Sequence, residues 1–395
     1  MKCLLCKQNK AVEFLNLGKQ PLANKYPATE EAFKTEDFFP LTVFFCTSCK
    51  NVQLGTIVSR ERMFEDYYYL SSVNPGLVRH FETFAKKLNK AKFVVDVGSN
   101  DGILLKPLKT MGVKAIGVDP SINVGKIAND QGLTTIVSFF NDETAEKIKK
   151  QYGKPDVVVA SSIFTHLENP HEFIDAVKNM MTEDGDFIIE VEYIGNILKD
   201  VQFERFYLDR IFYYSLTSLK HLFEAHNMYV SDVEKIEPHG GSIRVTAKNI
   251  GKKKTVSAKT MLLLQEEKIK LTPAKLKEFK KKVESYIKAF RDKLKEYKKL
   301  KLNVGGYGAP ARVATITNFG KIGPELIEFI IDDSPLKQDR FSPGMHIPIF
   351  PKTHLETHKP DVLVVFAYEY FDDIKKKTND GKYRYLIAIP PREVK

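Results

Sequence analysis

The sequence predicts an α/β protein with three parts: a small cysteine-rich lobe, a doubly wound parallel sheet, and a second, smaller α/β unit. Three observations predict this fold. All four cysteines lie in two CxxC pairs within the first fifty of the 395 residues. Short β-branched segments then alternate with helical stretches, and a glycine-rich turn follows a long lysine-rich stretch. The expected parts are 1–72, 73–250, a basic helical linker at 251–301, and 302–395.

The cysteine pairs are Cys3 with Cys6 and Cys46 with Cys49. Two intervening residues let both thiolates of a pair reach one face of an ion, and two pairs complete a tetrahedral zinc site. Neither pair follows the strand–helix pattern of a thioredoxin-type redox motif. We therefore expect all four cysteines to bind structural zinc.

An aromatic segment, Phe64–Leu70, follows the cysteines, and a helical pattern runs from Val78 to Leu88. Buried strands are then expected in a doubly wound sheet that Ser242–Ala247 closes. They are Phe93–Val97, Ala115–Val118, Thr135–Val137, Val157–Ala160 and Phe187–Val191. In the last unit we expect strands at Leu302–Val304, Glu328–Ile331 and Val362–Phe366, with a turn at Gly305–Gly308.

The net charge of +11 suggests nucleic-acid binding, but most of it is local. Between Glu266 and Lys301, 14 basic and 6 acidic residues give +8. Apolar residues recur there at steps of three and four, which predicts one amphipathic helix with a solvated lysine face. They are Leu276, Phe279, Val283, Ile287, Phe290, Leu294 and Tyr297.

No apolar run approaches the length of a membrane span, and Met1–Lys10 has no apolar signal segment. Together with reduced, metal-type cysteines, this predicts a cytoplasmic protein. We expect neither a membrane nor a nucleic acid as partner.

A glycine turn follows the first strand of the central sheet. Gly98 lets the backbone approach a ligand, and Asp119, 21 residues later, ends the next strand, where a carboxylate can accept ribose hydroxyls. The loop lacks the third glycine of a dinucleotide fingerprint and the lysine of a phosphate-binding loop. It therefore favours S-adenosylmethionine (SAM), although an acidic residue at a strand end also occurs in ordinary solvated turns. The other expected cofactor residues are Asp96, Asn100, Asp101, Phe140 and Ser161.

Several separate motifs occur in one order along nearly the whole chain. Besides the cysteine pairs they are Pro21–Asn24, Val52–Leu54, the tyrosines before Ser71-Ser72, Ser99–Gly102, His239–Arg244, Gly306–Ala311, Asp332-Asp333 and Ser342–Pro348. In these motifs the chain resembles the sugar C-methyltransferase family, SAM-dependent zinc-containing enzymes that act on nucleotide-linked 4-keto-deoxysugars.

The resemblance implies a zinc lobe that helps to hold the sugar, a central class I methyltransferase domain, and a Rossmann-like C-terminal domain that contacts the nucleotide-sugar without a redox cofactor. It implies a nucleotide-sugar as partner; we expect a monomer or weak homo-oligomer. The substrate-binding residues expected from it are Tyr67, Tyr69, Arg244, Tyr307 and Arg312.

One departure concerns the chemistry. The family places a histidine base in a Tyr-His-Glu-His segment, where this chain has Tyr207, Leu208, Asp209 and Arg210. A guanidinium with a pKa above about 12 cannot accept a proton at working pH. Arg210 is therefore not the base.

Three hypotheses remain open. Carbon methylation persists with His166 or His239 as the base and Arg210 stabilising the enolate. Alternatively, the acceptor is a hydroxyl or amine, for which Asp209 or His166 suffices, or catalysis is lost and a sugar-binding protein remains. With Tyr207, these residues are the expected catalytic set. Structural roles are a helix cap for His166, a turn for His239 and an ion pair with Asp209 for Arg210.

Overall fold

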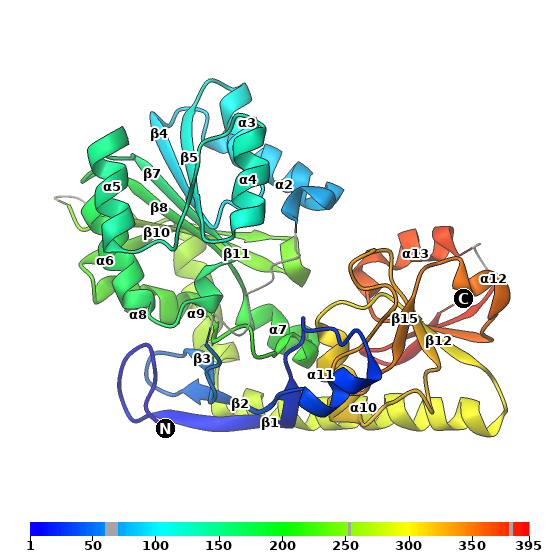
Figure 1. The fold of residues 1–395 in the computed structure, drawn as a ribbon. Helices are drawn as coiled ribbons and strands as arrows, with labels where there is room; N and C mark the ends of the chain where they lie inside the picture. Colours follow the sequence, from blue (N-terminus) through cyan, green and yellow to red (C-terminus); the bar gives the residue numbers. More distant parts are fainter. Residues whose placement is uncertain (60–69, 252–253, 379–381, 395) are drawn as a thin grey trace.

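The computed structural model describes residues 1–59, 70–251, 254–378 and 382–394, which form three sheets (Figure 1). Tyr67 and Tyr69 lie outside the described residues, so the structure does not place these two expected sugar-binding side chains. No helix in the described part of the chain is long and apolar enough to cross a membrane.

The N-terminal sheet takes its last strand from a distant part of the chain. Its order is β1-β2-β3-β9, all antiparallel, and η1 (Glu30–Thr35) lies between the first two strands. The strands are β1 (Ala11–Pro21), β2 (Phe38–Cys46), β3 (Val52–Leu54) and β9 (Phe212–Tyr213). Because β9 pairs with β3, residues near 210 are anchored to the cysteine lobe.

The central sheet has the order β10-β11-β8-β7-β4-β5-β6, with five parallel strands and an antiparallel pair at one edge. All five expected parallel strands and the closing strand are present. The strands are β4 (Phe93–Val97), β5 (Lys114–Asp119), β6 (Thr135–Val137), β7 (Val157–Ser161), β8 (Asp186–Glu192), β10 (Met228–Ile236) and β11 (Ser242–Asn249). The sequence analysis missed β10.

Helices cover both faces of the central sheet, as a doubly wound fold requires (Figure 1). They are α2 (Pro75–Lys87), α3 (Leu105–Thr110), α4 (Ile122–Asp130), α5 (Asp142–Tyr152), α6 (Pro170–Met180) and α8 (Leu216–Glu224). The helix after β8, α7 (Ile194–Asp200), instead packs in the core of the outer lobes. The expected helix from Val78 to Leu88 is α2.

The C-terminal sheet has the order β14-β15-β13-β12-β16-β17-β18, parallel except at its two edges. The strands are β12 (Val304–Tyr307), β13 (Phe329–Ile331), β14 (Arg340–Phe341), β15 (Pro348–Phe350), β16 (Val362–Val365), β17 (Arg384–Ile387) and β18 (Arg392–Val394). The helices are α11 (Arg312–Gly320), α12 (His354–Thr357), η6 (Tyr368–Tyr370) and α13 (Phe371–Lys377).

The bounds expected for β12 were wrong: the strand was expected at Leu302–Val304 and lies at Val304–Tyr307. Gly305 and Gly306 lie within the strand because neighbouring side chains leave no room for a Cβ: one at Gly305 would lie 2.9 Å from the ring of Phe329. The turn instead comes at Gly308, whose φ is +84°.

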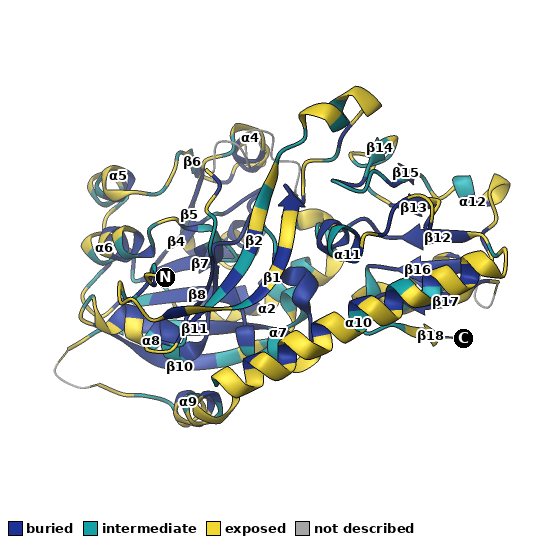
Figure 2. Ribbon diagram, turned by 90° about the horizontal axis from the view of Figure 1, so that it is seen from below, coloured by how far each residue is buried: buried dark blue, intermediate teal, exposed yellow. Residues whose placement is uncertain are grey.

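The long basic helix is α10 (Pro273–Lys299), preceded by α9 (Ala258–Lys270). Its predicted apolar stripe is buried and its opposite face is exposed, as the yellow bands of Figure 2 show. Towards its N-terminus, Phe279 lies 6.2 Å from Phe14 of the N-terminal sheet, and further along Phe290 lies 6.4 Å from Phe366 of the C-terminal lobe, ring centre to ring centre. The helix therefore packs against both outer lobes (Figure 1).

Candidate functional site

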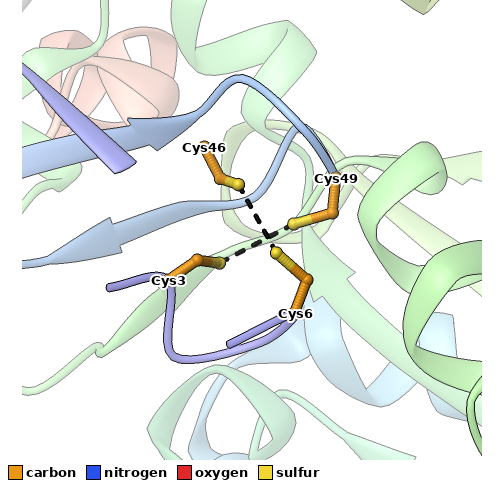
Figure 3. Close-up of side chains that lie close together, drawn as sticks. All are labelled: Cys3, Cys6, Cys46 and Cys49. Carbon is orange, nitrogen blue, oxygen red and sulfur yellow. Dashed lines mark hydrogen bonds between the residues drawn. The ribbon is translucent and has the colours of Figure 1, made fainter. Parts of the chain in front are cut away.

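The four cysteines converge on one point between the N-terminal turn and the β2–β3 turn (Figure 3). All four sulfurs lie within 4.8 Å of one another; Cys3 and Cys49 are 3.7 Å apart, and Cys6 and Cys46 are 3.6 Å apart. A disulfide needs about 2 Å, whereas tetrahedral zinc with 2.3 Å bonds spaces its sulfurs by about 3.8 Å. The donor set therefore fits zinc.

Side chains from two parts of the chain hold this cysteine cluster. Gln53 accepts the backbone N–H of Leu4 at 2.8 Å and the side-chain amide of Asn51 at 3.3 Å. From the central domain, His171 on α6 lies 2.8 Å from the carbonyl of Leu5 through Nε2. The cluster is therefore packed against the central domain.

The turn after β4 has the backbone expected of a ligand-binding loop. Gly98 has φ +78°, which favours glycine, and a Cβ there would lie 2.4 Å from Ile163. The glycine thus allows close packing of Ile163, in addition to the backbone turn. Asp119 accepts the N–H groups of Asn100 and Ser121, both at 2.9 Å. The side chain of Ser121 also hydrogen-bonds Asp119. A carboxylate can accept several hydrogen bonds, so Asp119 can still meet a ligand.

Three buried carboxylates gather at this turn: Asp96, Asp101 and Asp119. None of them forms an ion pair with any other residue that the structure describes. Burial, followed by the charges of Asp119 and Glu190, raises the pKa of Asp96 to about 8. Burial also raises the pKa of Asp119, against the hydrogen bonds that it accepts. A ligand with net positive charge would relieve this repulsion.

Further polar atoms at the turn have no hydrogen-bond partner in the described ranges: Ser99 Oγ, Asp101 Oδ1 and Ser161 Oγ. Such buried atoms carry a desolvation cost unless a ligand or water bonds to them. The second oxygen of Asp101 accepts the backbone N–H of Ser72 at 3.1 Å, and Asn100 accepts that of Ser71 at 3.0 Å. These two expected cofactor residues therefore also anchor the segment that leads into α2.

Apolar side chains flank the same edge of the sheet. The ring of Phe140, expected at the cofactor, packs on Phe173 at 4.9 Å between centroids. Two neighbours outside the list of expected cofactor residues, Ile122 and Phe139, are 77% and 50% exposed. Ile122 follows Asp119 by three residues at the start of α4, and an exposed isoleucine at a strand–helix junction was the available signal.

The segment with Tyr207, Asp209 and Arg210 runs from η4 (Phe203–Arg205) to β9, beside the carboxyl ends of β7 and β8. Asn24 of the Pro21–Asn24 motif donates its amide to Asp209 at 2.6 Å. The N–H of Leu54 donates to the carbonyl of Ile211 at 2.9 Å. The N-terminal lobe thus fixes this segment, which we call the crossover (203–211).

Arg210 is paired, but not with Asp209 as the structural alternative predicted. Its guanidinium forms an ion pair with Glu192 at the end of β8 and stacks 4.8 Å from the ring centre of Tyr207. Burial would raise the pKa of Glu192, but the charges of Arg210 and Arg205 outweigh it and the pKa is lowered. Asp209 keeps a raised pKa through burial, in spite of the bond from Asn24.

The two candidate bases both approach Arg210. His166, in η3 (Phe164–His166), bonds through Nδ1 to the backbone carbonyl of Asp209. Since a carbonyl only accepts, Nδ1 carries the proton and the lone pair of the neutral ring is on Nε2. Burial, then the charge of Arg210, lowers the pKa of His166 to about 4. Its ring is therefore neutral at pH 7.

His239 is a turn residue, as its structural alternative predicted. It has φ +57°, and the following Gly240 and Gly241 also have positive φ. Burial lowers the pKa of His239, and the charges of Arg210 and Arg205 add to this against Glu192. Its loop lies against Arg205, because a Cβ on the following Gly240 would lie 2.2 Å from that guanidinium.

The expected sugar-binding residues that the structure describes each have a partner within the protein. Arg244 pairs with Glu190 at 2.6 Å and stacks on Phe84 under α2. The hydroxyl of Tyr307 donates to Asp333 at 2.8 Å within the C-terminal lobe. Arg312 pairs with Glu369 at the lobe boundary. Of the three, only Arg312 comes near the crossover, through Glu369 and its partner Arg205.

Comparisons with known proteins agree along the chain. A zinc binding domain matches residues 3–64, a methyltransferase domain matches 60–233, and a C-methyltransferase C-terminal domain matches 237–390. C-methyltransferase NovU of Streptomyces niveus is 29% identical, and the alignment covers 100% of this chain and 96% of that protein. In order along its length, the chain is therefore similar to C-methyltransferases that carry a zinc binding domain.

More distant relatives match only in part. The mitochondrial ubiquinone biosynthesis O-methyltransferase of Arabidopsis thaliana is 28% identical, and the alignment covers 30% of this chain and 39% of that protein. Among solved structures, magnesium protoporphyrin IX methyltransferase of Synechocystis PCC 6803 covers 48% of this chain and 89% of its own, with 14% identity and a TM-score of 0.35.

The protein is therefore a SAM-dependent methyltransferase with a zinc-binding lobe. The cysteine geometry fits zinc, and the uncompensated carboxylates at the β4 turn fit SAM, whose sulfonium and ammonium groups give it net positive charge. Glu192, Arg205 and Glu369 were not among the site residues expected from the sequence. The available sequence signal for Glu192 was a charged residue within the apolar strand β8, and no local pattern indicated which residue it pairs with.

Proposed function

We propose that this methyltransferase transfers the methyl group of SAM to the carbon beside the ketone of a nucleotide-linked deoxysugar. The observation that carries this proposal is His166, whose tautomer is set by the carbonyl of Asp209 beside Tyr207 and Arg210. A neutral imidazole with its lone pair on Nε2 can remove a proton from carbon, whereas Arg210 cannot.

The roles follow from the protonation of each group. Nε2 of His166 removes the proton from the carbon beside the ketone, and this generates an enolate. The carbon of the enolate then accepts the methyl group. Tyr207 keeps its hydroxyl proton because burial raises its pKa, so it can donate to the enolate oxygen. Arg210, balanced by Glu192, supports Tyr207 by stacking and adds a second donor. His239 is the alternative base.

SAM supplies an electrophilic methyl group when bound. Its proposed contacts are the backbone at Gly98, the carboxylates of Asp96, Asp101 and Asp119, and the apolar side chains of Ile122, Phe139 and Phe140. Because the methyl must lie in line with the acceptor carbon, the protein's main contribution is alignment and exclusion of water.

For the nucleotide we propose the junction of the N-terminal and C-terminal lobes. There the hydroxyl of Tyr26 donates to the carbonyl of Ala309 at 2.7 Å, and the ammonium of Lys337 lies 5.4 Å from the ring centre of Tyr26. Lys337 donates to the same carbonyl, while its closest approach to Asp332 is 3.9 Å. This cation is better placed for a phosphate than Arg312, which is already paired.

We propose that the chain is divided by function into a zinc lobe (1–72), a methyltransferase domain (73–250), a helical linker (251–301) and a C-terminal domain (302–395).

A hydroxyl acceptor is the second candidate, and the raised pKa of Asp209 favours it, because a carboxylate of raised basicity can accept a hydroxyl proton. The test incubates the zinc-loaded protein and SAM with keto, hydroxy and amino nucleotide-sugars. Product mass and NMR identify the methylated atom. We expect carbon methylation of a keto sugar and loss of at least about 100-fold in kcat for His166→Ala.

Two results would contradict the proposal: methylation on oxygen or nitrogen, or normal turnover of both His166→Ala and His239→Ala. His221→Ala, an exposed histidine of α8, is the matched control and should keep wild-type turnover. If no product forms, calorimetric titration with S-adenosylhomocysteine shows whether the protein fails to bind the cofactor or whether the panel lacks the right acceptor.

A further inference from the structure

The short helix η6 (Tyr368–Tyr370) of the C-terminal lobe contacts the methyltransferase domain through three successive side chains. The hydroxyl of Tyr368 donates to Glu204, and Glu369 pairs with Arg205 of the crossover. The hydroxyl of Tyr370 accepts the amide of Asn74 at 3.1 Å. One turn of the C-terminal lobe therefore reaches two separate parts of the central domain.

The contact of Glu369 continues towards the proposed catalytic residues. Arg205 lies between Glu369 and Glu192, with its Nη1 3.4 Å from a Glu192 oxygen, and Glu192 pairs in turn with Arg210. The side chains of Arg205 and Glu192 are 9% and 4% exposed. Because buried charges need their partners, a change at Glu369 alters how Glu192 is shared between the two arginines.

The loop that carries His239 rests on the same ion pair. A Cβ on Gly240 would lie 2.2 Å from Arg205 and 2.9 Å from Glu369, so the loop backbone is in contact with both side chains. The pair of Arg205 and Glu369 thus supports Arg210 on one side and His239 on the other.

The contact of Tyr370 leads towards the cofactor loop. Asn74 caps α2 by accepting the N–H of Gly76 at 2.9 Å and of Leu77 at 3.2 Å. It closely follows Ser71 and Ser72, whose N–H groups bond to Asn100 and Asp101 of the cofactor loop. The second contact of η6 therefore ends beside the proposed SAM site.

We propose that η6 positions the methyl-transfer site from the C-terminal lobe, with Glu369 as the positioning residue of the crossover and Tyr370 that of the segment over the cofactor loop. The inference rests on the roles proposed above for Arg210 and His239. Substrate bound to the C-terminal lobe would thereby meet an already aligned crossover.

The test compares Glu369→Gln and Tyr370→Phe with Asp372→Asn, which removes a charge from an exposed neighbour. In Glu369→Gln, amide hydrogen exchange should become about tenfold faster at 203–210 and 237–241 and stay unchanged in β4 and β5. In Tyr370→Phe, the increase should be confined to 71–77. Asp372→Asn should match the wild type.

Kinetics with the acceptor found above give a second readout. Glu369→Gln should lower kcat about tenfold with KM for SAM within about twofold, which a general loss of stability would not produce. Unchanged exchange at 203–210 in Glu369→Gln would overturn the inference. An equal loss of kcat in Asp372→Asn would overturn it as well. If Glu369→Gln does not fold, Tyr368→Phe must show faster exchange at the same segment. If no acceptor is methylated, the proposed function fails while the exchange result still decides this inference.

Discussion

At the scale of single residues, a buried ion pair occupies the place where the resemblance implies a histidine base. Arg210 is neutralised by Glu192 and stacked on Tyr207, so it is fixed in position and cannot accept a proton. The imidazole of His166 stands beside it, tied to the backbone of the same segment. Proton removal therefore moves from the crossover to the end of β7 in the proposed mechanism.

A first prediction concerns His166 and pH. Its pKa falls from 6.5 to about 4 in the folded protein, so between these values the unfolded chain binds more protons and stability rises with pH. From pH 7 to pH 5 this histidine should account for a loss of about 2 kcal/mol of unfolding free energy. Urea denaturation at both pH values measures it.

His166→Gln should reduce the difference between the two pH values by that amount, and His221→Gln should leave it unchanged. An equal pH dependence in wild type and His166→Gln would show that the ring is not buried as a neutral group. Above pH 7 the unfolding free energies of wild type and His166→Gln should differ by a constant amount, because His166 is then neutral in both the folded and the unfolded protein.

At the scale of elements, the crossover leads directly into β9, the last strand of the zinc lobe's sheet. β3 begins three residues after Cys49, and it pairs with β9, whose first residue lies two positions after Arg210. Metal binding that fixes the two cysteine turns thus also fixes β3 and, through it, the proposed catalytic segment. A structural zinc ion would therefore help to hold the proposed catalytic segment in position.

A second prediction follows for zinc removal. Treatment with a strong chelator should speed amide exchange in 207–213 and in β3 by about tenfold or more, while β4 and β5 keep their protection. Affinity for S-adenosylhomocysteine should change by less than about threefold, since the cofactor turn belongs to another sheet. Readdition of zinc provides the control. Uniform loss of protection, or none at 207–213, would contradict this account.

At the scale of the whole molecule, α10 joins the two outer lobes into one hydrophobic core. The cluster that contains its buried stripe also contains Leu15 of β1, Phe206 of the crossover and Val364 of β16. The lysines of α10 are exposed apart from the half-buried Lys293, as expected for a solvated helix face. The central sheet has a separate core.

A third prediction tests this shared core. Phe279→Ala should cost about 3–5 kcal/mol, because Phe279 is 3% exposed and packs on both Phe14 and Phe206. Exchange should rise in β1 and at 203–206 more than in β4. Lys281→Ala on the exposed face should change stability by less than about 0.5 kcal/mol. A loss confined to the C-terminal lobe would contradict the shared core.

The features that could be predicted from the sequence alone are local ones. Cysteine spacing indicated the metal site, β-branched alternation indicated the parallel strands, and the stripe from Leu276 to Tyr297 indicated α10. These signals are short in range, since each depends on the period of one element or the reach of one side chain. The edge strand β10 and the bounds of β12 were not predicted because partly polar or glycine-rich strands lack that period.

Only the tertiary structure decided which charges meet. Glu192, Arg205 and Glu369 come from three separate segments, and their pairing depends on how the C-terminal lobe docks on the crossover. The structure likewise paired Arg210 with Glu192 rather than Asp209, Arg244 with Glu190 and Tyr307 with Asp333. Pairing between distant residues depends on burial and docking, and no local pattern in a chain encodes either of them.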